Sequence, residues 1–330
     1  MSHPSSMRAV TQSGPGGPEV LVVETLPVPK PGQGEVLIRV AWAGVNPHDT
    51  NQRKRGSPPP GQTPVFGLEC SGEIVAVGSA ADAGRIGQKV CAIVPGGAYA
   101  EYCLSPTGLA LLQPKGLSER EAGAIMESLF TAWFNMMELA GLKPGERVLA
   151  HGGTGGVGST AIMIANLIVA EAYGTVGTEE KRKLCIALGA KAAINYRTED
   201  VVKAVMEVSG GKGVDVIVET SSADYTTKNI DMLAKDGRIA YISGGKDKRL
   251  AVPVSAIMGK RARVMGSLMR PWELPRKLKV AAALTETVWP VIGSRMKPLI
   301  DSEFTLETAA DAHRRSESGE ATGKILIKVV

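Results

Sequence analysis

The sequence predicts an α/β fold in which a β-rich unit accompanies a doubly wound parallel sheet. Three observations predict it: short apolar runs between Gly and Pro clusters fill the first third of the chain, strand and helix patterns alternate after residue 118, and a glycine-rich turn joins one strand of that region to an apolar helix. Because strands that alternate with helices of this length form βαβ units, the second region is expected to be a parallel sheet covered by helices.

The length and composition agree with a folded protein of two domains. The chain has 330 residues, of which 44% are hydrophobic and 22% charged, and a chain of this length usually exceeds a single hydrophobic core. The net charge is +5, but the longest basic cluster, Arg53 to Arg55, has only three residues, and aromatic residues make up 4%. We therefore expect no nucleic-acid partner, and the mild basicity fits a protein that handles an anionic cofactor.

The cysteines and the apolar stretches indicate a cytoplasmic protein with no membrane partner. The four cysteines have neither the paired spacing of a zinc site nor the density of a disulfide scaffold, so reduced thiols are expected. The first residues lack an apolar signal core. The longest apolar stretch, near residues 161–172, is interrupted by Asn166 and Glu171 and is too short to span a bilayer.

The first region, residues 7–114, is predicted to be a barrel-like or sandwich-like β unit. The runs at residues 20–23, 35–40 and 72–77 are typical of short strands between turns. The stretch from residue 53 to 64 is expected to be a loop, because it carries three consecutive prolines.

The region after residue 118 carries the alternating pattern. Ser118 and Glu121 form a capping box that opens a helix, and an apolar periodic segment covers residues 129–140. The predicted strands are residues 147–150, 172–176, 214–219, 238–243 and 263–266. The predicted helices are residues 159–170, 179–188, 200–208 and 225–233. A helix over residues 274–291 and a β-like end, residues 324–330, follow, and the end is expected to pair with the β-rich unit.

The strongest motif is the segment HGGTGGVG, residues 151–158, between the strand at 147–150 and an apolar helix. Gly153, Gly155 and Gly158 satisfy G-x-G-x-x-G in the strand-to-helix context of a Rossmann dinucleotide site. The first glycine allows the tight turn, the second lets the backbone approach the pyrophosphate, and the third lets helix and strand pack closely. The helix N-terminus supplies N–H donors for the phosphates. A purely steric glycine turn is the alternative, and the absence of Lys-Ser/Thr after the glycines argues against an ATP-type loop.

The end of the next strand predicts NADPH over NADH. An acid at this tip would bind the ribose 2′-OH and repel a 2′-phosphate, but residues 176–178 read Val-Gly-Thr. Glu179 and Glu180, in the first turn of the next helix, are explained by the helix dipole. The candidates for binding a 2′-phosphate are Thr178, Lys181, Tyr196 and Arg197.

Several further stretches resemble the medium-chain dehydrogenase/reductase superfamily, most of all its zinc-free quinone oxidoreductase group, over essentially the whole chain. They are GVNPHDTNQR (44–53), GLECSGEIVAVG (67–78), GGAYAEY (96–102), GLKPGERVLAHGG (141–153), AINYRTED (193–200) and GKILIKV (323–329). The resemblance implies a GroES-like catalytic domain from residues 1–124 and 268–330, and a Rossmann NADP-binding domain from residues 125–267. It also implies NADPH-dependent hydride transfer to a quinone or α,β-unsaturated carbonyl, and a homodimer or a dimer of dimers.

The resemblance also implies that no catalytic metal is bound. In the zinc alcohol dehydrogenases a Cys ligand stands where this chain has Asn46, and the His of a G-H-E motif is replaced by Leu68. A catalytic zinc needs three protein ligands and an open position. Without a Lewis acid the chain suits acceptors that are already electron-poor.

Site residues follow from the matching motifs. The resemblance implies that Asn46 lies beside the nicotinamide and the acceptor, and that Thr131 lies along the cofactor. The implied cofactor-binding residues are Gly156 and Val157 over the pyrophosphate, Thr178, Lys181 and Tyr196 around the 2′-phosphate, Gly244, Gly245 and Leu268 beside the nicotinamide half, and Lys324 from the tail.

Two histidines and one difference from the family pattern leave alternatives open. His48 could protonate the reduced acceptor as a neutral imidazole, or it could be a loop residue bonded to Asp49. His313 lies in a polar helical stretch and is expected to be exposed. Relatives often carry a Tyr over the acceptor pocket where this chain has Ser57. An enoyl-thioester or alkenal reductase, or a weakly catalytic NADPH-binding regulatory protein, are therefore the alternative functions.

Overall fold

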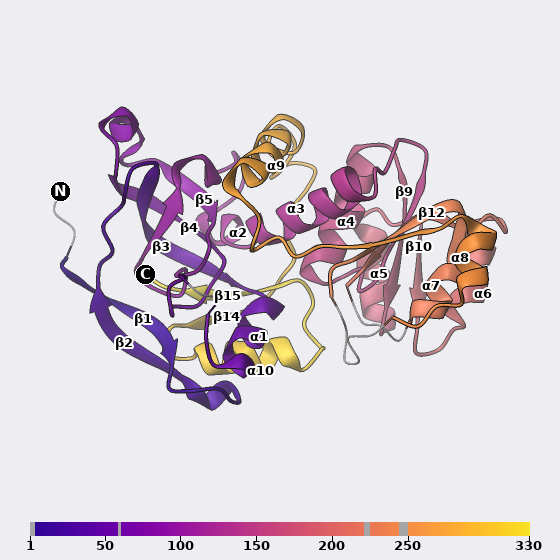
Figure 1. Ribbon diagram of the computed structural model, residues 1–330, viewed down its shortest axis with the longest axis horizontal. Helices are drawn as coiled ribbons and strands as arrows, with labels where there is room; N and C mark the ends of the chain where they lie inside the picture. The colour runs from indigo at the N-terminus through magenta and orange to yellow at the C-terminus, as the bar shows by residue number, and fades with distance from the viewer. Residues whose placement is uncertain (1–3, 59–60, 221–224, 244–249) are drawn as a thin grey trace. The chain divides into compact units, whose positions relative to one another are not determined.

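The computed structural model describes residues 4–58, 61–220, 225–243 and 250–330. The chain divides into two compact units: unit 1 comprises Met1–Glu127 and Glu273–Val330, and unit 2 comprises Ser128–Trp272. Figure 1 shows the strands and helices of each. None of the helices in the described parts of the chain is long and apolar enough to cross a membrane.

Unit 2 is built on a parallel sheet whose six described strands run in the order β10-β9-β8-β11-β12-β13. The chain moves outward from β8 to β10, then returns to β11 on the other side of β8, so the strand order reverses between β8 and β11. In open sheets of this kind, ligands bind at the carboxyl ends of the strands near such a switch point. The strands are β8 (Arg147–Ala150), β9 (Glu171–Val176), β10 (Ala192–Asn195), β11 (Val214–Glu219), β12 (Leu233–Tyr241) and β13 (Arg263–Gly266).

Two helices of unit 2 begin at a side chain that caps them. Thr178 accepts a hydrogen bond from the N–H of Lys181 at the start of α5, and Asp200 does the same for Lys203 at the start of α6. The helices are α4 (Gly156–Leu167), α5 (Glu179–Ala187), α6 (Val201–Val208), α7 (Thr226–Met232) and α8 (Val254–Lys260). Before them, α3 (Met126–Trp133) continues into a π-helical turn, η4 (Phe134–Leu139).

Unit 1 contains a mostly antiparallel sheet in the order β14-β15-β3-β4-β5-β7, with β6 paired to β3, and a separate pair of strands, β1 and β2. The C-terminal strand β15 pairs antiparallel with β3 through Ile325 and Val45, so the predicted pairing of the chain end with the β-rich region is confirmed. The strands are β1 (Ser6–Gln12), β2 (Leu21–Pro27), β3 (Glu35–Val45), β4 (Glu69–Val77), β5 (Lys89–Ile93), β6 (Tyr102–Pro106), β7 (Ala110–Leu112), β14 (Ile300–Thr305) and β15 (Lys324–Lys328).

Helices surround this sheet of unit 1. They are α1 (Pro47–Arg55), α2 (Glu119–Ala122), α9 (Leu274–Thr287) and α10 (Ala309–Glu317), with short 3₁₀ segments η1 (Pro18–Val20), η2 (Ala80–Arg85) and η3 (Thr107–Leu109). The predicted capping box is confirmed: Ser118 and Glu121 satisfy each other's backbone N–H groups at the start of α2.

The prediction of a loop from residue 53 was wrong at its beginning. Arg53 to Arg55 form the last turn of α1, which starts with a capping box between Asn46 and Asp49 and ends at Gly56 with a φ of 86°. Glycine adopts this left-handed conformation without a steric penalty, so it is suited to end a helix. The prolines that suggested a loop lie beyond this cap, and His48 is therefore a helical residue.

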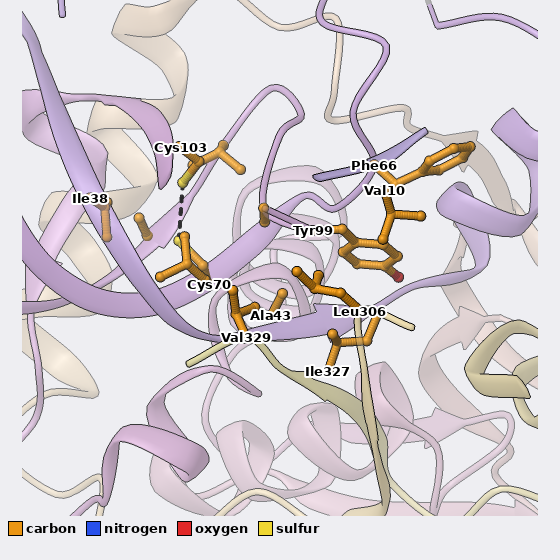
Figure 2. Packing of buried hydrophobic residues seen from close by; sticks show 14 of the residues in the cluster. Val10, Ile38, Ala43, Phe66, Cys70, Tyr99, Cys103, Leu306, Ile327 and Val329 are labelled. Carbon is orange, nitrogen blue, oxygen red and sulfur yellow. Dashed lines mark hydrogen bonds between the residues drawn. The ribbon is translucent and has the colours of Figure 1, made fainter. Parts of the chain in front are cut away.

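The core of unit 1 packs side chains from distant parts of the chain (Figure 2). The thiols of Cys70 and Cys103 form a hydrogen bond of 3.5 Å and no disulfide, and all four cysteines of the chain are free and buried. Burial raises the pKa of Cys91 well above that of an exposed thiol. The Cys91 thiol is consequently held in its protonated, unreactive form.

Candidate active site

The glycine turn after β8 is sharp, and its left-handed residue is Gly152, with a φ of 64°. The sequence motif assigned the tight turn to Gly153. At Gly153 a Cβ would lie 2.8 Å from the sulfur of Cys185, so this glycine is required by its packing against α5 and not by its φ. Gly152 is thus a residue of the loop that the motif did not identify.

The start of α4 is open to an anion. Gly155 is the N-cap and offers no side-chain cap, and Gly156, Val157 and Gly158 are the first three helical residues. Their N–H groups have no acceptor within the helix. A Cβ on Gly158 would lie 2.2 Å from the carbonyl oxygen of Gly152, so only glycine permits this close approach of helix and turn. Such a cradle of backbone donors fits the pyrophosphate of a dinucleotide.

The end of β9 gathers four of the predicted 2′-phosphate residues within unit 2. Thr178 caps α5 and Lys181 lies one turn along it. A Cβ on Gly177 would meet the hydroxyl of Tyr196 at 2.7 Å and Nε of Arg197 at 3.4 Å, so these two side chains lie against the strand tip. Thr178, Tyr196 and Arg197 therefore lie at a strand end that carries no acid, and Lys181 follows in the first turn of α5.

Two carboxylates lie in the first turn of α5. Glu179 accepts a hydrogen bond of 3.2 Å from Asn195 and pairs with Arg182 at 3.4 Å. Backbone and Thr178 hydrogen bonds lower the pKa of Glu180, so its carboxylate is ionised next to the Thr178 hydroxyl. Glu179 is engaged within the protein, whereas Glu180 adds a negative charge close to the strand tip.

His151 links the glycine turn to the core of unit 2. The fully buried imidazole contacts Thr175 Oγ1 at 3.0 Å through Nδ1 and Asn229 Oδ1 at 2.8 Å through Nε2, and it stacks on the ring of Tyr225. Both ring nitrogens are satisfied by side chains of the same unit. This arrangement gives His151 a structural role.

In unit 1 the buried side chain of Asn46 is held by three neighbours. Its Nδ2 donates to the carbonyl of Gly44 at 3.3 Å and to Glu69 Oε1 at 3.0 Å, and its Oδ1 accepts a hydrogen bond from Lys324 Nζ. Donor and acceptor ends of the amide are both engaged, so the amide has one orientation.

Glu69 is the partner that the sequence analysis did not identify. Its Oε1 lies 2.6 Å from Lys324 Nζ, and its Oε2 accepts the backbone N–H of Glu127 at 3.0 Å. The side chains of Glu69 and Lys324 are 0% and 6% exposed, and a Cβ on Gly44 would lie 2.3 Å from the carboxylate. No local sequence pattern signals this pair, because β4 carries a second acid, Glu73, and the lysine partner of Glu69 lies on β15.

Asp49 completes a second buried polar contact beside Asn46. Its carboxylate accepts the N–H of Asn46 at 2.8 Å, the N–H of Gly67 at 3.3 Å and the hydroxyl of Tyr99 at 3.2 Å. Burial raises the pKa of Asp49 from 3.8 to about 6. Because the folded state favours the protonated acid, this contribution to stability is present below pH 3.8 and is lost as the pH rises through about 6. The half-buried His48 lies next to it, at the second position of α1.

The expectation that His313 is exposed was wrong, because α10 packs on the core of unit 1. The imidazole is 0% exposed, and the rings of Phe66 and Tyr99 meet it edge-on. Burial lowers the pKa of His313 to about 3, so the ring is neutral. Its Nδ1 lies 3.3 Å from the guanidinium of Arg53, which also pairs with Glu317 at 2.9 Å.

The remaining predicted residues are placed as follows. Thr131 is buried in α3, and its carbonyl accepts a hydrogen bond of 2.8 Å from Asn135. Leu268 follows β13 and is 71% exposed. Gly244 and Gly245 lie outside the described residues. Among the residues that the structure describes, no group of three His, Cys, Asp or Glu side chains is placed to hold a metal ion.

Two family models match the chain. The alcohol dehydrogenase GroES-like domain matches residues 32–115, and the zinc-binding dehydrogenase model matches residues 156–285. With the β-rich unit and the parallel sheet, these matches confirm the predicted fold class.

Known proteins match over nearly the whole chain. Quinone oxidoreductase of Homo sapiens is 33% identical, with 97% of each chain covered. A solved quinone oxidoreductase of Escherichia coli in complex with NADPH is 26% identical, with 98% of this chain and 99% of that chain covered and a TM-score of 0.86. A solved NAD-dependent alcohol dehydrogenase is 32% identical, with 98% and 100% covered and a TM-score of 0.87.

A different relative is much longer than this chain. One subunit of the phenolphthiocerol/phthiocerol polyketide synthase of Mycobacterium tuberculosis is 32% identical over 96% of this chain, but the match spans only 14% of that synthase protein. From the glycine cradle, the two matching family models and the full-length relatives, we conclude that the chain is an NAD(P)-dependent oxidoreductase that belongs to the quinone oxidoreductase group of the medium-chain dehydrogenase/reductase superfamily.

Proposed function

We propose that the chain is an NADPH-dependent reductase of quinones or α,β-unsaturated carbonyls that acts without a metal. The observation that carries this proposal is the glycine cradle, where the uncapped start of α4 fits a pyrophosphate and a Cβ on Gly158 would collide with the turn. The relatives named for quinone reduction support the acceptor class.

In this proposal the chain's own residues bind and orient. The N–H groups of Gly156, Val157 and Gly158 hold the pyrophosphate. When bound, NADPH supplies a hydride to an electron-poor carbon of the acceptor. The Asn46 amide, locked by Glu69 and Lys324, presents a rigid polar surface, and this preorganisation avoids the cost of ordering the side chain during the reaction.

The test of the function is a turnover assay with NADPH against a quinone panel, an enone and an enoyl thioester. We expect the quinones and the enone to be reduced faster than the thioester. The polyketide synthase relative favours the thioester as the second candidate, an enoyl-thioester reductase. Binding of NADPH without turnover of any acceptor would contradict both and would favour a regulatory NADPH-binding protein.

The cofactor preference is tested at the end of β9. We expect the wild type to bind NADPH at least about 10-fold more tightly than NADH, because charge-assisted hydrogen bonds contribute about 1.5 to 3 kcal/mol each. The double variant Lys181→Gln/Arg197→Gln should weaken NADPH binding by about that factor and leave NADH binding unchanged. Lys203→Gln, on the exposed surface of α6, is the matched control. Equal affinity of the wild type for the two cofactors would refute the preference.

His48 is proposed as the proton donor to the reduced acceptor. His48→Gln should lower kcat by about 100-fold or more, since a positioned general acid typically contributes that much. The pH profile alone does not identify the donor, because Asp49 also titrates near neutrality, with a pKa of about 6. Asp49→Asn is therefore measured in parallel and should retain the inflection that belongs to His48. Full turnover and an unchanged profile in His48→Gln would eliminate this role.

A further inference from the structure

A cavity of about 790 Å³ opens at the edge of the unit 2 sheet where the strands begin. Arg147, the first residue of β8, and Lys235, near the start of β12, both line it. The glycine cradle follows the other end of β8. Because the strands of this sheet are parallel, the cavity and the cradle lie at opposite edges of the same sheet, and the proposed cofactor site does not explain the cavity.

Basic side chains outnumber acidic ones in the lining. Arg147, Lys212, Lys235 and Lys260 contribute four positive charges, and Asp215 and Asp231 contribute two negative ones, which leaves an excess of two positive charges. Lys260 is engaged by the protein, since its Nζ donates to the carbonyls of Asp231 at 3.3 Å and Leu233 at 2.6 Å. Lys212 and Lys235 have exposed side chains, and no carboxylate in the described ranges forms an ion pair with either of them.

Arg147 is held in the wall of the cavity by Asp215. Its backbone N–H, Nε and NH2 donate to Asp215 at 2.8, 3.0 and 3.2 Å. Its NH1 is buried and, among the described residues, has no acceptor. A nitrogen buried this deeply offers no surface to a molecule in the cavity, so Arg147 contributes its positive charge to the wall and no direct hydrogen bond from NH1.

The cavity also has an apolar side and free space. Ile230, Ala234 and Ala256 line it beside the cations. A Cβ on Gly259, in α8, would have no atom within 4 Å. The volume lies in the range of about 300 to 1,000 Å³ that is usual for small-molecule sites.

We propose that this cavity binds a small organic phosphate, with the phosphate group at the ammonium groups of Lys212 and Lys235 and the body of the molecule against the apolar side. A phosphate monoester carries a charge between about −1.5 and −2 at neutral pH, which matches the excess of two positive charges. Its oxygens accept hydrogen bonds from the ammonium groups of Lys212 and Lys235, and such charge-assisted hydrogen bonds are stronger than neutral ones.

The experiment uses the full chain and titrates it calorimetrically with adenosine 5′-monophosphate, inorganic phosphate and adenosine, each with and without saturating NADPH. The NADPH covers the glycine cradle, and adenosine reports the apolar body without the charge. We expect the monophosphate to bind in the presence of NADPH at least about 10-fold more tightly than adenosine. It should also bind more tightly than inorganic phosphate, because only the monophosphate has a body that contacts the apolar side.

Two variants separate charge from space. Lys212→Gln/Lys235→Gln should weaken binding of the monophosphate about 10-fold, and Lys203→Gln, elsewhere on unit 2, should not change it. Gly259→Leu places an apolar side chain in the open space at the cavity wall and should weaken binding of the monophosphate by narrowing the space for its body. It is expected to fold, because Gly259 has open space around it and leucine is a better helix former than glycine. Its affinity for NADPH should equal that of the wild type.

Three results would overturn the proposal. The first is no heat from the monophosphate in the wild type, and the second is binding that saturating NADPH abolishes, which would place the ligand at the cradle. The third is equal affinity in the wild type and in both cavity variants. If NADPH itself does not bind, the proposed cofactor site fails, but the titrations without NADPH and the two variants still test the cavity. Failure of the cofactor site is therefore distinguishable from failure of the phosphate site.

Discussion

Replacing Glu69 by alanine is expected to lower the free energy of unfolding by about 3 to 5 kcal/mol, because it leaves the buried ammonium group of Lys324 without its partner. It also removes the acceptors for Asn46 Nδ2 and for the N–H of Glu127. Urea denaturation of the variant and the wild type measures the difference.

The matched control for this prediction is Glu73→Ala on the same strand. Glu73 is 35% exposed and pairs with the exposed Arg39, so its loss should cost no more than about 1 kcal/mol. The double variant Glu69→Ala/Lys324→Met removes both charges and should regain part of the stability, which gives a coupling energy for the pair. A loss below about 1 kcal/mol in Glu69→Ala would show that the pair does not stabilise the fold.

Adding a single methyl group at Gly158 is expected to weaken NADPH binding by about 100-fold, since displacement of a binding group by about 1 Å can have an effect of that size. In Gly158→Ala the new Cβ would lie 2.2 Å from the carbonyl oxygen of Gly152, so the turn or the start of α4 must move. The change also overpacks the turn, at a cost of about 1 to 3 kcal/mol of stability. Fluorescence titration with NADPH and the urea midpoint measure the two effects separately.

Gly84→Ala is the control for Gly158→Ala. No atom lies within 4 Å of a Cβ at Gly84, so this methyl group should change neither stability nor binding by a measurable amount. If Gly158→Ala keeps NADPH affinity within about threefold of the wild type, a margin of less than 1 kcal/mol, the cradle is not the pyrophosphate site.

The sequence predicted best those elements whose signal is local. The runs at residues 147–150, 214–219 and 263–266 coincide with β8, β11 and β13. For the buried strands β8 and β11 the reason is that strands covered on both faces read as nearly continuous apolar runs. β10 was missed, since Ala-Ala-Ile-Asn has a single β-branched residue and little strand propensity. α8 was also missed, and α1 was obscured by the prolines that follow its cap.

The two parts of the candidate site also differ in how far apart in the sequence their contacting residues lie. The glycine turn and the start of α4 depend on neighbours within a few positions, so they could be read from the sequence together with the fold class and the family. The contacts of Lys324 with Asn46 and of Arg53 with His313 join residues 278 and 260 positions apart. These contacts are visible only in the folded structure. The packing of strands and helices decides which side chains meet a buried charge, and no local sequence pattern encodes that packing.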